Sequence, residues 1–154
     1  MADTVLDPNE RFEGFWNGQE VKPKRVWSGH RFTDDEIANV SRLTHANKLS
    51  IDICIKYVRL AQDIINGNVV ELSYEEPIKS TGFVKDTFNS VIYAFSTTSS
   101  YKECVLKAVN LGGDTDTITA IAGGLAGIKY GYDSIPREWI KTLRGKDIVD
   151  SCLF

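Results

Sequence analysis

The residues with the greatest capacity for chemistry are two aspartates, Asp114 and Asp116, which stand two positions apart and are followed directly by Thr117. Carboxylate and hydroxyl oxygens are the ligands that Mg²⁺, Ca²⁺ and Mn²⁺ prefer. Gly112 and Gly113 come immediately before, and glycine lets a backbone adopt positive φ or approach a ligand closely. The run therefore predicts a metal or phosphate site.

A helix positions these oxygens, because apolar residues recur at helical spacing directly after them. They are Ile118, Ile121, Leu125 and Ile128, and glycine and alanine occupy most of the positions between them. A helix of this composition is buried on most sides. The predicted site thus lies at a helix N-terminus. The alternative is that Asp114 and Asp116 only cap the helix, a task that needs one side-chain oxygen.

Composition places the chain among single-domain proteins with a core of their own, since it has 154 residues. The net charge of −3 gives no general attraction to nucleic acid. Three widely spaced cysteines and two histidines favour neither a disulfide framework nor a zinc site. No signal peptide or membrane-spanning stretch is evident. We expect a soluble, cytoplasmic protein that binds neither nucleic acid nor membranes.

The predicted fold class is all-α, with an irregular N-terminal arm over residues 1–33 and a helical domain over residues 34–154. One helix begins at Asp34 with three acidic residues in its first turn and ends near residues 46–47. The next covers residues 49–65. Its apolar face consists of Ile51, Ile55, Val58 and Ile65, and it is widened by Cys54, Leu60, Ala61 and Ile64. Gly67 is placed to stop this helix.

Three further helices complete the prediction. One begins near residues 81–82 and continues through Phe95. Another begins at Ser100, which forms a capping box with Glu103. It leads directly into Gly112, Gly113 and the four residues 114–117, which we call the acidic run. The last has Pro136 in its first turn and carries Trp139 and Ile140.

Four motifs, in order, resemble those of the ADP-ribosylglycohydrolase family. They are Thr-His at 44–45, Ser-Thr-Gly-Phe-Val at 80–84, Gly-Asp-Thr-Asp-Thr at 113–117 with Ala-Ile-Ala-Gly at 120–123, and Tyr-Gly at 130–131 with Ile-Pro-Arg-Glu-Trp at 135–139. The resemblance extends over residues 34–145 and corresponds to the C-terminal half of the family's helical fold. It implies an Mg²⁺-dependent hydrolase that releases ADP-ribose from modified side chains or related compounds.

The resemblance also implies roles for individual residues. Asp114, Asp116 and Thr117 correspond to metal ligands, and Asp116 is our candidate catalytic residue. Thr44 and His45 correspond to contacts of the diphosphate or ribose, and Gly82 and Phe83 to contacts near the adenosine. Gly112 and Gly113 complete the ligand-binding set.

The N-terminal region departs from the family pattern. Family enzymes are about twice this length, and their N-terminal half carries a second Thr-Asp-Asp ligand cluster. Thr33, Asp34 and Asp35 have the right types, but they lie only ten residues before Thr44. The favoured alternative is that Asp34 and Asp35 cap the first helix.

Two functions therefore stay open. The first is an ADP-ribosylglycohydrolase that acts on ADP-ribose linkages, with missing ligands supplied by a rearranged N-terminus, a second copy or a separate chain. The second is an inactive family member that binds ADP-ribose or a partner protein. Under this second hypothesis an exposed apolar face of the helical domain would be an interaction site.

Overall fold

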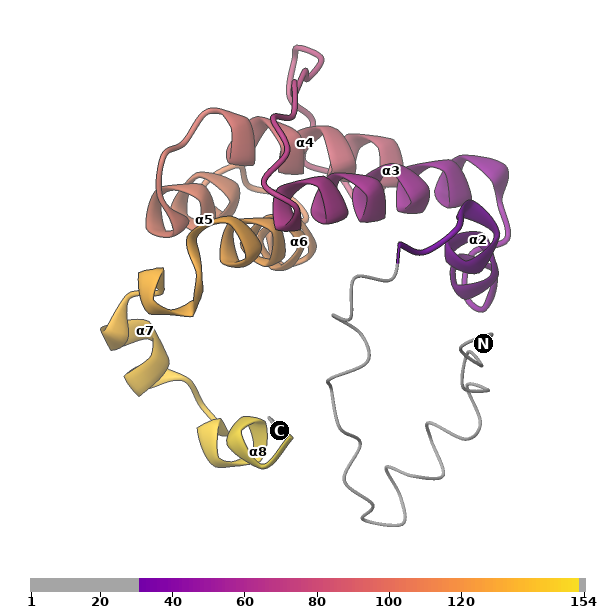
Figure 1. Cartoon of the computed structure of the whole chain (residues 1–154). Coiled ribbons are helices and arrows are strands. Elements are labelled where there is room, and N and C mark those ends of the chain that lie inside the picture. Colours follow the sequence, from indigo (N-terminus) through magenta and orange to yellow (C-terminus); the bar gives the residue numbers. More distant parts are fainter. Residues whose placement is uncertain (1–30, 153–154) are drawn as a thin grey trace. The chain divides into compact units, whose positions relative to one another are not determined.

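The structure, a computed structural model, describes residues 31–152, and this part of the chain contains α-helices, a short 3₁₀ helix and no strand, which confirms the all-α prediction. The predicted arm over residues 1–33 lies almost entirely outside the described residues. Figure 1 shows the order of the elements along the chain: α2 (Asp34–Arg42), α3 (Lys48–Ile65), α4 (Val84–Ser96), α5 (Tyr101–Val109), α6 (Thr115–Tyr130), η2 (Tyr132–Ser134), α7 (Arg137–Thr142) and α8 (Lys146–Cys152).

The described residues fall into two units. Helices α2 to α7 belong to one unit, Phe32–Thr142, and the described part of the other consists of Arg31 and residues 143–152, which include α8. All predicted site residues lie in the first unit. Within residues 31–152, no helix has the length and apolarity needed to cross a bilayer.

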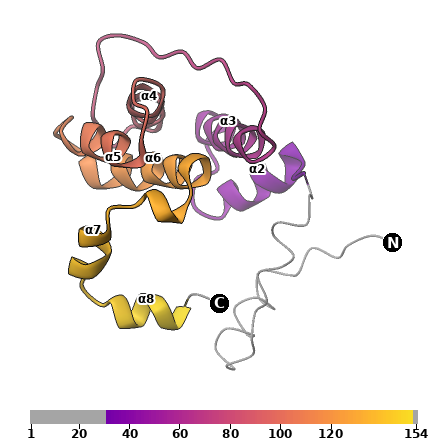
Figure 2. The same ribbon diagram turned by 60° about the vertical axis from the view of Figure 1, so that its left-hand side comes forward.

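Helix α6 is the centre of the first unit, because it contacts α3, α4 and α5. Figure 2 shows α3 and α4 nearly end-on above α6, which crosses the view. The side chains of Ile118, Ala122, Leu125 and Ala126 are completely buried. Glycines on other sides of α6 leave room for tyrosines: a Cβ atom at Gly124 would lie 3.2 Å from the Tyr57 hydroxyl oxygen. Small residues thus bring the neighbouring helices close to the α6 backbone.

Helix α3 buries only part of its predicted apolar face. Ile53 and Leu60 are its buried residues, and Tyr57, Ala61 and Ile64 pack against the core. The predicted face residues Ile51, Ile55 and Val58 are only half-buried, and Ile65 is 46% exposed. Leu60, Ala61 and Ile64 meet the core as predicted. The central position predicted for the other four was wrong, because α3 carries apolar residues on most sides and spacing alone does not select the face that meets the core.

Capping residues set the helix ends, in part as predicted. Helix α2 ends at Arg42, before residues 46–47, because Asn47 instead caps α3 by accepting a hydrogen bond from the Leu49 N–H at 2.9 Å. Gly67 follows α3 with φ +70°, as a C-terminal stop requires.

Half of the predicted capping box is present at α5. The Ser100 hydroxyl accepts from the Glu103 N–H at 3.2 Å. The Glu103 carboxylate, however, accepts from the N–H and the hydroxyl of Ser99, each at 3.0 Å, rather than from the Ser100 backbone. These contacts, led by the Ser99 N–H, lower the pKa of Glu103.

The burial of Leu125 generates a stability prediction. We expect Leu125→Ala to lower the free energy of unfolding by about 2–5 kcal/mol, because it opens a cavity where α6 meets its neighbours. Leu106→Ala is the matched control, since Leu106 is 41% exposed, and it should cost less than about 1 kcal/mol. Urea denaturation measures both, and equal losses would contradict the central position of α6.

The Glu103 contacts generate a pH prediction. A carboxyl whose folded-state pKa lies below its usual 4.5 stabilises the fold at pH values above 4.5. That stabilisation disappears as the pH falls through the folded-state pKa. Wild type should therefore be more stable than Glu103→Gln near neutral pH, and the difference should shrink in acid. A difference in melting temperature that stays constant over this pH range would contradict the assignment.

Candidate functional site

The acidic run forms the first turn of α6 and the residue before it. Asp114 occupies the N-cap position, but its side chain makes no capping hydrogen bond to the helix backbone. Its Oδ1 instead accepts from the Thr117 hydroxyl at 2.9 Å. Asp114 is half-buried, whereas Asp116 and Thr117 are exposed. Capping of α6 therefore does not explain why an aspartate stands at position 114. Its carboxylate oxygens can accept further contacts from a ligand.

Asp116 stands in the first turn of α6, two residues after Asp114. The pKa of Asp116 is lowered, first by the Thr117 backbone N–H, then by the Asp114 side chain within hydrogen-bonding reach, and then by its own N–H. Backbone N–H groups at a helix N-terminus favour negative charge. Asp116 is accordingly ionised at neutral pH, as a ligand to a cation must be.

A loop from another part of the chain lies against the acidic run. The Ser80 carbonyl accepts from the Asp114 N–H at 3.4 Å, and the Ser80 hydroxyl donates to the Gly112 carbonyl. Gly113 has φ +62°, and a Cβ atom there would lie 2.1 Å from the Ser80 carbonyl oxygen. Only glycine fits at this position. The structure thus brings together the two predicted motifs around residues 80–84 and 113–117.

Gly82 and Phe83 are part of the same arrangement. A Cβ atom at Gly82 would lie 3.4 Å from the Asp114 Oδ2, so that the loop backbone passes beside this carboxylate. Phe83 is the N-cap residue of α4 and is 53% exposed. Gly82, Phe83, Gly112 and Gly113 are all exposed, and they belong to the two segments that meet at Ser80 and Asp114.

Thr44 and His45 lie in the connection between α2 and α3, and both are exposed. Their side chains contact each other, with 3.0 Å between His45 Nδ1 and Thr44 Oγ1. The other hydrogen bonds described for them run to Ser41. In the part of the chain that the structure describes, no hydrogen bond links these two residues to the acidic run. Their contact with a ligand stays a prediction.

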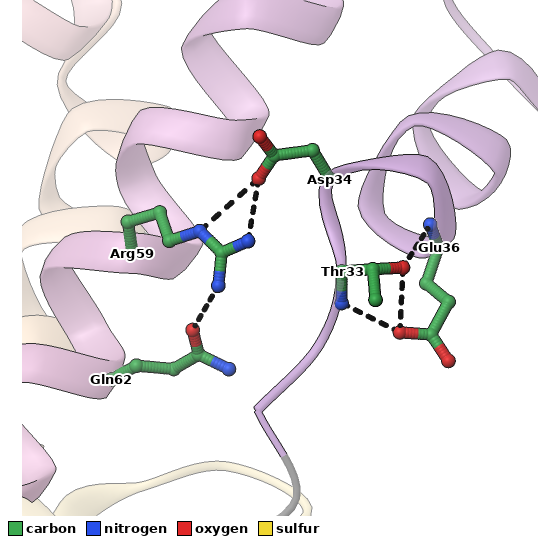
Figure 3. Close-up of polar contacts among 5 residues, drawn as sticks. All are labelled: Thr33, Asp34, Glu36, Arg59 and Gln62. Carbon is green, nitrogen blue, oxygen red and sulfur yellow. Dashed lines mark hydrogen bonds and ion pairs between the residues drawn. The ribbon is translucent and has the colours of Figure 1, made fainter.

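The candidate second cluster at residues 33–35 has a structural role. The Thr33 hydroxyl accepts from the Glu36 N–H at 3.2 Å, and the Glu36 carboxylate accepts from the Thr33 N–H at 2.6 Å, which is a complete capping box. The Asp34 Oδ1 accepts from Arg59 Nε at 3.1 Å and from Arg59 Nη2 at 2.6 Å (Figure 3). The favoured capping alternative was right in kind but wrong in residue, because Thr33 rather than Asp34 or Asp35 caps α2.

The Asp34 contacts extend into α3. Arg59 Nη1 donates to the Gln62 side-chain oxygen at 3.1 Å, so that the guanidinium joins Asp34 to Gln62 (Figure 3). This ion pair fastens the start of α2 to α3.

Within residues 31–152, no group of three or more histidine, cysteine, aspartate or glutamate side chains could hold a metal ion. The acidic run therefore supplies two carboxylates and one hydroxyl, without a third carboxylate from this part of the chain.

A surface depression of about 530 Å³ lies between α4 and α5 and includes Asn110 and Leu111, but none of the predicted site residues. The cation at its edge is already engaged, because Lys107 Nζ donates to the Thr97 hydroxyl at 2.8 Å and lies 4.8 Å from the centre of the Tyr93 ring. The acidic run is the better candidate site on chemical grounds.

Comparison with protein families matches residues 69–153 to the model described as ADP-ribosylglycohydrolase. The matched residues include the acidic run and the loop of residues 79–83 around Ser80.

Individual relatives agree with this match. The chain is 34% identical to the ADP-ribosyl-[dinitrogen reductase] glycohydrolase of Rhodospirillum rubrum over 119 residues, which cover 67% of this chain and 40% of that protein. It is 35% identical to the ADP-ribosylarginine hydrolase Tri1 of Serratia proteamaculans over 80 residues, or 52% of this chain and 22% of the relative. The ADP-ribosylhydrolase ARH3 of Mus musculus is 32% identical to it over 102 residues, which cover 57% of this chain and 27% of that protein. The chain thus spans less than half the length of each of these relatives, and it belongs to the ADP-ribosylglycohydrolase family.

Proposed function

We propose that the acidic run binds Mg²⁺ and that the chain takes part in hydrolysis of an ADP-ribosyl glycosidic bond. The observation that carries the proposal is the pair of carboxylates at the start of α6, where Asp114 makes no helix cap and Asp116 stands in the first turn. Family membership supports the class of reaction, since the relatives named above are ADP-ribosyl hydrolases.

The donor set fits Mg²⁺. This ion usually keeps several waters and is held by one or two carboxylates together with substrate oxygens, so a dedicated cage of protein ligands is unnecessary. Asp114, Asp116 and Thr117 would provide two carboxylates and a hydroxyl at the start of α6, where Asp114 is half-buried and the other two are exposed. When bound, the ion would orient sugar hydroxyls and lower the pKa of a water.

The protein's own groups would hold and orient the substrate. The ionised Asp116 carboxylate would stabilise the positive charge that develops on the ribose as the glycosidic bond breaks. The backbone at Gly112, Gly113 and the start of α6 would receive the diphosphate, because a helix N-terminus favours anions. The exposed ring of Phe83 would stack on the adenine.

Any further protein ligands, beside waters and substrate oxygens, would come from outside residues 31–152, because Thr33 and Asp34 are committed to the α2 cap and to Arg59. Residues 1–30, a second copy of the chain or another polypeptide are the possible sources.

A second candidate function follows from another observation: Val40 on α2 and Leu43 at its C-cap are 69% and 70% exposed. An ADP-ribose-binding or partner-binding module without hydrolysis would use such a surface.

The first experiment tests both candidates together. Calorimetric titration of Mg²⁺ and then ADP-ribose into the full chain should show binding, beside an assay for release of ADP-ribose from ADP-ribosylated protein. Loss of an outer partner of a metal already weakens binding by about 10–100-fold, so we expect Asp116→Ala to weaken Mg²⁺ binding by more than about tenfold. ADP-ribose binding without release would favour the binding module, and absence of Mg²⁺ binding would contradict the metal site.

A second variant separates the two acidic regions. Asp34→Asn should leave Mg²⁺ affinity unchanged, because Asp34 is paired with Arg59 rather than facing the acidic run. Its effect on the free energy of unfolding should stay below about 1 kcal/mol, as is usual for exposed ion pairs. A Mg²⁺ affinity that fell in Asp34→Asn as far as in Asp116→Ala would show that Asp34 is a ligand after all.

A further inference from the structure

We propose that Ser80 is the positioning residue of this site, which fixes the acidic run in the orientation that a ligand requires. The inference rests on the proposed function of Asp114 and Asp116 and adds a residue that acts through its contacts with Gly112 and Asp114.

Ser80 makes two hydrogen bonds to the backbone, one just before the acidic run and one at its first residue. Its hydroxyl donates to the Gly112 carbonyl, and its own carbonyl accepts from the Asp114 N–H at 3.4 Å. These bonds lie on either side of Gly113, whose missing side chain allows the contact. Because Asp114 makes no side-chain cap of its own, these are the described bonds that orient the start of α6 relative to the neighbouring loop.

Ser80 is itself held from the core by α4. The Ser90 hydroxyl, fully buried, donates to the carbonyl of Lys79 at 3.0 Å. The Thr87 hydroxyl, 7% exposed, donates to the carbonyl of Thr81 at 3.0 Å. The residues on both sides of Ser80 are thus fixed by buried hydrogen bonds, which are costly to leave unmade.

The same loop also positions the other predicted ligand contacts. The Thr81 hydroxyl donates to the Asp86 carboxylate at 2.8 Å and accepts from the Phe83 N–H at 3.2 Å. Phe83 is therefore bonded to Thr81, the residue directly after the Ser80 that bonds Asp114. Two motifs about thirty residues apart act as a single rigid unit through Ser80.

The test compares Ser80→Ala with Ser80→Thr, which keeps the hydroxyl. Calorimetric titration with MgCl₂ should show affinity about tenfold weaker in Ser80→Ala and near wild type in Ser80→Thr. Ser73→Ala, in the same connection between α3 and α4, is the exposed matched control and should bind as wild type does. The melting temperature of Ser80→Ala should fall by less than about 4 °C, so that weaker binding does not reflect unfolding.

Amide hydrogen exchange gives a readout that needs no metal. Exchange at Asp114 should be faster in Ser80→Ala by about tenfold, while buried amides of α6 such as that of Leu125 keep the wild-type rate. Unchanged Asp114 exchange would overturn the positioning role even if the wild-type chain binds Mg²⁺. Faster exchange in a chain that binds no Mg²⁺ would support the positioning role and count against the proposed function instead.

Discussion

Helix α6 has to be buried along its length and accessible at its first turn. Glycine and alanine let α3, α4 and α5 approach its backbone, while Ile118 and Leu125 fill the space between the helices. Asp114, Asp116 and Thr117 stand where this apolar helix meets solvent. A movement of α6 within the core would therefore move all three oxygen donors together, because they belong to one helical turn.

Orientation of that turn depends on polar contacts with α4. Buried hydroxyls of Thr87 and Ser90 hold the chain around Ser80, and Ser80 contacts the backbone on both sides of Gly113. Packing sets the position of α6, and these hydrogen bonds set how its N-terminus meets the next loop. By contrast, Asp34 and Arg59 only join α2 to α3, at a place where the sequence resembles a ligand cluster.

Sequence reasoning was strongest where a local signal decides structure. The α6 helix, the stop at Gly67 and the cap at Ser100 each depend on residues close in the chain. On α3 it identified Leu60 but not the buried Ile53, because Ile51 and Ile55 fit a helical period equally well and only the tertiary neighbours distinguish them. The acidic run was recognisable from its own residues, but the role of Ser80 was not, because its partners lie about thirty residues away. The ligand contacts of Thr44 and His45 stay predictions.

The central claim is that Asp114, Asp116 and Thr117 are ligands of a divalent cation, and anomalous diffraction from crystals of the full chain grown with Mn²⁺ tests it most directly. The account predicts an anomalous peak within bonding distance of the Asp114 and Asp116 carboxylates, with further ligands from water or from residues outside 31–152. Crystals with no peak at the start of α6, in which the two carboxylates are paired with lysine or arginine side chains, would contradict it.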